Sequence, residues 1–305
     1  GDARGIPPRT RRRQRARPSR AADAMSTAAS RLETLITADG HRYELIARIP
    51  DDADRALLWL PAMGVPAKHY LPFAERLAAR GVAVFLHEWR GIGSSGLRAG
   101  GGADWGYREL LDEDIATSAR AMRAATAGLA PVIGGHSLGG QLACCHLARQ
   151  PDGVGALWLV ASGAPYWRAF PVPQRYALPP LYRFMGWLSR VRGVLPGRRL
   201  GFAGNEAPGV IADWSRSGIT GSYRAAGLEL DLDAALARVD VPVRAVCLQA
   251  DWLGPPSSLH FLLSKLGTSA PAVVSLDAAA LGVAADHFAW MKRPDAVVEW
   301  LTRSD

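Results

Sequence analysis

The sequence predicts an α/β protein whose mostly parallel sheet is covered by helices on both faces. Short apolar runs of strand length alternate along the chain with stretches whose apolar residues recur every three or four positions. This alternation is typical of doubly wound sheets, in which a helix returns the chain to the next parallel strand. The length agrees, because 305 residues, 49% of them apolar, can bury one large core.

The first two strands are predicted as a hairpin, Arg31 to Ile36 and Tyr43 to Ile49, around the turn signal Asp39-Gly40. Six further apolar runs have the length of strands that are buried on both faces. These runs are Ala56 to Leu60, Val82 to Leu86, Val132 to Gly135, Ala156 to Val160, Val243 to Leu248 and Val273 to Leu276. The predicted sheet therefore has eight strands.

Five stretches between these strands have the apolar spacing of helices that cover a core. They are Leu71 to Arg80, Tyr107 to Ala125, Gln141 to Arg149, Leu259 to Leu266 and His287 to Leu301. Residues 163–240 break the alternation, because they separate two predicted core strands by far more than an ordinary connection. We therefore expect a core formed by residues 25–162 and 241–305, and an inserted substructure at residues 163–240.

The positive charge of the chain is concentrated in two segments. Residues 1–24 hold eight Arg and two Asp, so they supply six of the formal net charge of +8. Their Arg- and Pro-rich composition has no apolar periodicity and predicts a disordered extension rather than a secretory signal. Residues 163–205 hold seven Arg, eight aromatic residues and no acidic residue. The inserted segment is therefore expected to favour anionic groups and to make at most a weak contact with a membrane surface, and no nucleic-acid partner is expected.

Other patterns narrow the class of protein further. Three cysteines are too few for a disulfide framework, which predicts a reducing, cytoplasmic compartment. No run approaches the roughly 18 apolar residues of a membrane span. No His or Cys cluster has metal-ligand spacing and no glycine-rich loop has the Lys-Ser/Thr of a phosphate loop, so neither a metal nor a cofactor is expected. The oligomeric state does not follow from these patterns.

The segment Gly135-His136-Ser137-Leu138-Gly139 has the form G-x-S-x-G. A strand-like run precedes it and a helical run follows it, which is the context of a nucleophile elbow. Such a tight turn needs small residues two positions before and after the serine, and both are glycine here. We therefore predict that Ser137 is a nucleophile and that the backbone N–H of Leu138 faces a developing oxyanion.

The order of the motifs resembles that of the α/β-hydrolase superfamily, from about residue 31 to residue 303. Leu60-Pro61-Ala62-Met63-Gly64 stands where the superfamily has its His-Gly oxyanion turn, and His87 to Ser95 is similar to its D-x-R-G-x-G-x-S loop. The runs Pro61 to Pro66 and Gly201 to Ser215 are more closely similar to a little-characterised bacterial branch of predicted α/β hydrolases. The resemblance implies the α/β-hydrolase fold with a lid inserted into its eight-stranded sheet.

A serine nucleophile needs a base, and the base needs an acid that holds its tautomer. In the fold that the resemblance implies, the chain order is Ser, then Asp or Glu, then His. His287 follows the last predicted strand and is the predicted base, and Asp251 lies in the loop after the preceding strand and is the predicted acid. Asp286 is the alternative acid. Alignment to the His-Gly turn makes the backbone N–H of Met63 the second oxyanion donor.

These residues predict a serine hydrolase that cleaves a carboxylic ester or a related acyl compound through an acyl-enzyme on Ser137. A small-molecule acyl substrate is the expected partner, and the activity resembles that of carboxylesterases and lipases. One alternative is an acyltransferase with the same triad. Another is a binding protein that retains the fold without catalysis, because Pro61-Ala62 replaces the His-Gly pair.

Overall fold

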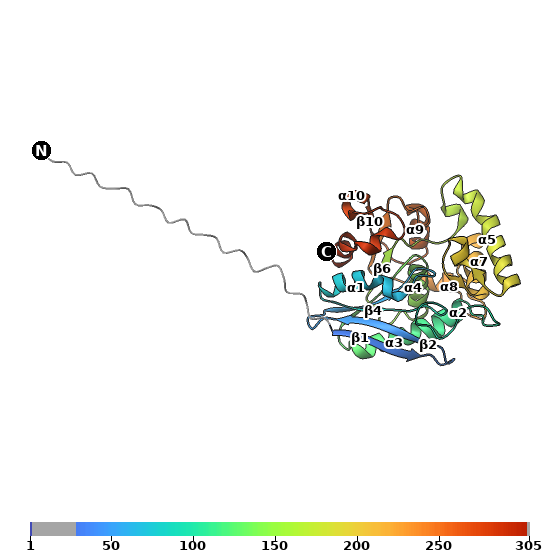
Figure 1. Cartoon of the computed structure of the whole chain (residues 1–305). Helices are drawn as coiled ribbons and strands as arrows, with labels where there is room; N and C mark the ends of the chain where they lie inside the picture. The colour runs from blue at the N-terminus through green and yellow to red at the C-terminus, as the bar shows by residue number, and fades with distance from the viewer. Residues whose placement is uncertain (2–28, 304–305) are drawn as a thin grey trace.

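A computed structural model of the chain describes Gly1 and residues 29–303 (Figure 1). The extension predicted at residues 1–24 therefore lies, apart from Gly1, outside the described residues. Eight strands form one sheet in the order β1-β2-β4-β3-β5-β6-β9-β10. They are β1 (Ala29–Ile36), β2 (Arg42–Ile49), β3 (Arg55–Leu60), β4 (Val82–Leu86), β5 (Ala130–His136), β6 (Ala156–Val160), β9 (Val243–Leu248) and β10 (Ala272–Leu276).

Only β2 runs against its neighbours in this sheet, and all pairs from β4 to β10 are parallel. The predicted eight-stranded, mostly parallel sheet is thus confirmed. The central strand β3 is buried on both faces: Leu58 and Leu60 belong to one core cluster, whereas Leu57 and Trp59 belong to the other. This explains why its sequence is continuously apolar instead of alternating.

Helices cover both faces of the sheet. The face of Leu57 and Trp59 is covered by α1 (Leu71–Ala78), α10 (Ala278–Leu281) and α11 (Asp295–Thr302). The opposite face is covered by the continuous helical stretch α2 (Tyr107–Glu109), η2 (Leu110–Ile115) and α3 (Ala116–Ala125), with α4 (Leu138–Arg149), α8 (Leu232–Leu236) and α9 (Pro256–Leu263). The middle part of that stretch, η2, is a π-helix, which apolar spacing does not reveal.

The predicted helix from His287 to Leu301 is wrong in its first half. The structure has a short 3₁₀ helix η4 (Ala289–Lys292), then a break, and α11 begins only at Asp295. The break lies at Pro294, which has no N–H to donate and disfavours a helical conformation in the residue before it. His287 therefore lies in a loop and not in a helix.

The chain between β6 and β9 adds side chains to the same core cluster as Leu58 and Leu60. It contains η3 (Trp167–Ala169), α5 (Gln174–Arg192), β7 (Leu195–Pro196), α6 (Gly197–Leu200), β8 (Asn205–Glu206), α7 (Pro208–Thr220) and α8. Figure 1 shows α5 and α7 side by side, and the Tyr182 and Trp214 rings join them with centroids 4.9 Å apart. Strands β7 and β8 pair with each other, but each has only two residues, which is too short for the alternation of side chains that predicts a strand in the sequence.

Candidate active site

The candidate site lies at the carboxyl ends of the parallel strands, where open α/β sheets bind their ligands. The turns after β3, β5, β6, β9 and β10 and the inserted segment together line a cavity of about 500 Å³. Four of the predicted site residues line this cavity: Met63, Ser137, Leu138 and His287. The fifth, Asp251, is buried behind His287. Tertiary structure thus brings all five together.

Ser137 stands on a strained turn between β5 and α4. Its φ of 55° and ψ of −120° are unusual for a residue with a side chain. A Cβ at Gly135 would lie 2.3 Å from the carbonyl carbon of Gly139, and one at Gly139 would lie 2.0 Å from the carbonyl oxygen of Leu60. The glycines of the motif are therefore required by close backbone contacts, and the turn places the serine at the cavity.

His287 and Asp251 form a fixed pair. The Nδ1–H of His287 donates to Oδ2 of Asp251 at 2.8 Å, and Oδ1 of the same carboxylate accepts from the N–H groups of Leu253 and Gly254 at 2.9 and 3.0 Å. The geometry selects Asp251 over Asp286, whose carboxylate accepts from the backbone N–H groups of the following turn. With Nδ1 protonated, Nε2 of His287 is the proton acceptor.

The Ser137 hydroxyl makes no hydrogen bond to the His287 ring in this structure, although both residues line the cavity. Such bonds are often loose without substrate and tighten when the reacting complex forms.

Tyr70 is a site residue that sequence reasoning missed. Its buried hydroxyl accepts from the N–H of Ala62 at 2.9 Å and is hydrogen-bonded to Nδ1 of His136 at 2.8 Å. It therefore ties the turn that carries Met63 to the residue before the nucleophile. The N–H groups of Met63 and Leu138 donate to no acceptor among the described residues, so both remain available for an oxyanion.

His136 lies directly beside the candidate base. The centroids of the His136 and His287 rings are 4.7 Å apart. Burial, reinforced by the nearness of His287, holds the pKa of His136 well below its ordinary value. His136 therefore stays neutral and adds no second positive charge when His287 accepts a proton.

The wall of the cavity is mainly apolar. Helices α5 and α7 contribute Leu178, Met185 and Trp214, and no carboxylate of a described residue lines the space. Two polar atoms stand out, because the buried Oε1 atoms of Gln141 in α4 and Gln174 in α5 have no hydrogen-bond partner. An unpaired buried acceptor costs about 1–3 kcal/mol, so a substrate O–H or N–H in this place would be favoured.

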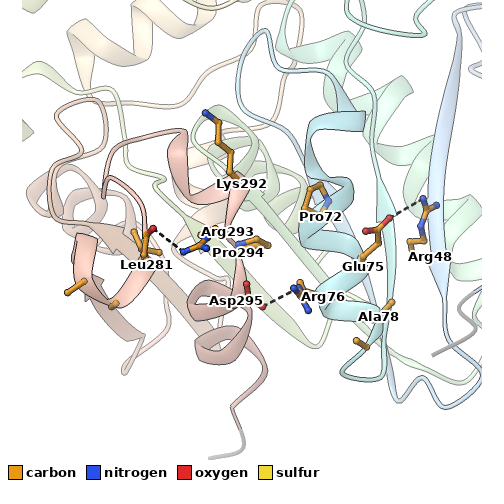
Figure 2. Close-up of a pocket in the computed structure, with 14 residues that line it drawn as sticks. Arg48, Pro72, Glu75, Arg76, Ala78, Leu281, Lys292, Arg293, Pro294 and Asp295 are labelled. Carbon is orange, nitrogen blue, oxygen red and sulfur yellow. Dashed lines mark hydrogen bonds and ion pairs between the residues drawn. The ribbon is translucent and has the colours of Figure 1, made fainter. Parts of the chain in front are cut away.

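A second hollow, of about 950 Å³, lies between α1 and the C-terminal elements (Figure 2). Four of its charged side chains lie in pairs: Arg76 pairs with Asp295 at 3.1 Å, and Arg48 approaches Glu75 at 3.8 Å. None of the five predicted site residues lines it. It therefore does not compete with the cavity at the strand ends.

A second Ser-His-Asp arrangement is buried near the loop that resembles D-x-R-G-x-G-x-S. Nδ1 of His41 lies 2.9 Å from Asp114, and Nε2 lies 2.8 Å from the Ser95 hydroxyl. Arg90 adds hydrogen bonds of 2.8 and 3.0 Å to the Asp114 carboxylate. All four side chains are buried and none lines either cavity. Because a substrate cannot reach these side chains, we interpret their hydrogen bonds as structural.

No group of three or more His, Cys, Asp or Glu side chains within residues 29–303 is arranged to hold a metal ion. No helix in this part of the chain is both long and apolar enough to cross a membrane.

Several solved structures share the fold. An esterase from Thermogutta terrifontis is 16% identical with a TM-score of 0.60, covering 89% of this chain and 96% of the esterase. The α/β-hydrolase domain-containing protein 10 from mouse is 17% identical with a TM-score of 0.57, covering 89% and 95%. An N-formylmaleamic acid deformylase from Pseudomonas putida is 17% identical with a TM-score of 0.56, covering 90% and 100%. At these identities the likeness shows the fold alone.

Comparison at the level of sequence is more specific. No curated protein sequence matches the chain. The family model of serine aminopeptidase S33, a group of α/β hydrolases, matches residues 51–206, just over half of the chain. That range contains the elbow, the Met63 turn and the start of the inserted segment. The superfamily expected from the motifs is thereby confirmed, and the chain belongs to the serine aminopeptidase S33 family of α/β hydrolases.

Proposed function

We propose that this hydrolase cleaves carboxylic esters through an acyl-enzyme on Ser137. One observation carries the proposal: Ser137, the His287–Asp251 pair and two unoccupied backbone N–H groups meet at one apolar cavity. A Ser-His-Asp arrangement alone does not identify an active site, because the buried Ser95, His41 and Asp114 side chains form one as well. The convergence of triad and N–H groups on a space that a ligand can enter is what serine hydrolysis requires.

The mechanism follows from these positions. Nε2 of His287 takes the proton of Ser137 as Oγ attacks the substrate carbonyl, while Asp251 stabilises the imidazolium. The N–H groups of Met63 and Leu138 hold the negative oxygen of the tetrahedral intermediate. His287 then returns its proton to the leaving alcohol, and water releases the acyl group by the same steps in reverse.

The cavity wall favours an ester over a peptide with a free N-terminus. A peptide ammonium group needs a carboxylate or several acceptors, and no described carboxylate lines the cavity. Leu178, Met185 and Trp214 instead offer an apolar surface to an acyl chain. Among the described residues, the unpaired buried side-chain acceptors of this wall are the amide oxygens of Gln141 and Gln174, and neither carries a charge. In this proposal residues 163–240 act as the lid that closes the acyl pocket.

Labelling by a fluorophosphonate tests the nucleophile. The wild type is expected to be labelled and Ser137→Ala is not, because the probe phosphonylates only an activated serine. Ser95→Ala is the matched control: it removes the serine of the buried arrangement and should leave labelling intact. An unlabelled, folded wild type would overturn the proposal in favour of a binding protein.

A series of p-nitrophenyl esters of increasing chain length tests the reaction and the pocket. We expect Ser137-dependent release of nitrophenol, with kcat/KM rising with chain length until the cavity is filled. A product that appears only when an alcohol or thiol acceptor is added would replace hydrolysis by acyl transfer.

A further inference from the structure

Helix α5 carries a second apolar stripe on its outward side. Tyr176, Phe184, Trp187 and Val191 recur at the spacing of one helix face and are 65, 49, 58 and 66% exposed. We propose that this stripe docks on the surface of an anionic phospholipid bilayer. Single exposed apolar residues are common, but a contiguous row of this size marks an interaction site.

The exposed stripe is not the side of α5 that packs against the rest of the protein. The opposite side of α5 is the one that packs on the molecule, through the buried Tyr182, Met185 and Ser189. The Phe184 and Trp187 rings lie near each other in the open, with centroids 6.0 Å apart. The helix therefore has two apolar faces, and only one is covered.

The exposed stripe continues into the mouth of the candidate active site. Several side chains both line the cavity and are largely exposed, and they come from separate parts of the chain. They are Leu181 and Phe184 of α5, Leu200 of α6, Trp252 after β9 and Phe288 after β10. An apolar rim built from both the inserted segment and the core surrounds the opening.

Charge indicates a lipid surface as the occupant. Arg183 and Arg190 are exposed beside the stripe and pair with no carboxylate of a described residue. Residues 163–205 contain seven Arg and no acidic residue. Aromatic rings flanked by guanidinium groups match the bilayer interface, where rings lie at head-group depth and arginines meet lipid phosphates.

Docking in this way would place the cavity mouth against the lipid. If the proposed ester hydrolysis holds, an acyl chain could then move from the bilayer into the cavity without crossing water. This consequence rests on the proposed function, whereas the docking itself does not.

Co-sedimentation with vesicles of phosphatidylcholine and phosphatidylglycerol tests the apolar part of the surface. Trp187→Glu combined with Val191→Glu should weaken binding about tenfold or more, because two inserted side chains become charged. Neither residue lines the cavity, so turnover of a soluble short-chain ester should not change. Leu32→Glu combined with Ile36→Glu, equally exposed on the edge strand β1, is the matched control and should bind like the wild type.

Neutralisation tests the charged part. Arg183→Gln combined with Arg190→Gln should weaken binding about fivefold for each arginine, and vesicles of phosphatidylcholine alone should bind poorly. Arg31→Gln combined with Arg80→Gln removes the same charge from exposed positions elsewhere and is the control. All variants keep residues 1–24, so the eight Arg of that segment act equally in each comparison.

Two outcomes would overturn the docking proposal. One is vesicle binding that the α5 variants leave at the wild-type level. The other is a dimer in light scattering that Trp187→Glu dissociates, which would assign the stripe to a second copy of the chain. Because these measurements need no catalysis, they stand whether or not the fluorophosphonate labels Ser137.

Discussion

The Asp251 carboxylate is held from both sides. Oδ2 accepts a hydrogen bond from the His287 ring, and Oδ1 accepts hydrogen bonds from two backbone N–H groups of the same loop. A carboxylate fixed in this way holds one tautomer of the histidine, and in the proposed mechanism it offsets the positive charge that forms in the transition state.

Replacing Asp251 by Asn tests this role. The amide would leave the loop intact but no longer hold the correct tautomer, so kcat on the ester should fall by about 10⁴-fold. Asp286→Asn is the control, because an amide oxygen can still accept from Phe288 and Ala289, and activity should stay near that of the wild type. Equal losses in the two variants would contradict the assignment of the acid.

Tyr70 acts through other residues and is a positioning residue. Tyr70→Phe removes the link between Ala62 and His136 and leaves both buried groups unpaired, which should cost about 1–3 kcal/mol of stability. Because the Met63 turn would also be loosened, kcat should fall about tenfold or more with little change in KM.

Tyr43→Phe separates the two effects. The Tyr43 hydroxyl is equally buried and lies 2.8 Å from the Asp114 carbonyl and 2.7 Å from Ser118, away from the cavity. It should lower the melting temperature to a similar extent but leave kcat unchanged. If both variants lose activity in proportion to stability, Tyr70 has no special role at the site.

At the scale of elements, the inserted segment packs directly on the turn that carries Met63. A Cβ at Gly64 would lie 1.9 Å from the backbone nitrogen of Gly204, so the two backbones touch. The Gly204 N–H donates to the buried Glu206 carboxylate at 3.0 Å. Burial raises the pKa of Glu206 to about 7, partly offset by that N–H.

The pKa of Glu206 predicts a pH-dependent stability. The folded protein binds this proton more tightly than the unfolded chain, whose pKa is near 4.5, so the stabilisation is complete below that pH and is lost as pH rises to about 7. Glu206→Gln should therefore melt like the wild type at about pH 4 and be more stable by about 3 kcal/mol at about pH 8.

The control for this effect is Glu229→Gln, an exposed position in the same inserted segment. Its melting temperature should differ from that of the wild type by the same small amount at both pH values. A stabilisation by Glu206→Gln that does not depend on pH would show that Glu206 is not the titrating group.

At the scale of the whole molecule, one ionic network, buried at Arg90 and Asp114 and exposed at Asp39, joins three distant segments. Arg90 pairs with Asp114 at 2.8 Å and with Asp39 at 2.6 Å, which connects the first hairpin, the loop after β4 and the helix over β1. Removing one partner of a buried pair leaves the other charge without compensation, and that is more costly than losing an exposed pair.

Arg90→Met should therefore lower the free energy of unfolding by about 3–5 kcal/mol, measured by urea denaturation. Arg76→Met is the matched control, because it breaks an ion pair whose side chains are both more than half exposed and should cost less than about 1 kcal/mol. A similar cost for both variants would mean that burial does not govern the strength of this network.

Much of the fold could be predicted because its signals are local. Eight strand-length runs and their helical connections follow from side-chain period, and the elbow follows from glycine and serine spacing at Ser137. His287 and Asp251 could be predicted because chain order assigns them to the loops after the last two strands. The break at Pro294 was also visible in the sequence, although the helix was predicted through it.

Contacts between distant segments account for the rest. Tyr70 and His136 meet across 66 positions of the chain, and no local pattern marks such a pair. No local pattern shows that His41 lies beside both Ser95 and Asp114, or that these three side chains are buried away from both cavities. The amphipathic period of α5 could not show that its second apolar face stays uncovered, since exposure depends on which surfaces the whole chain brings together.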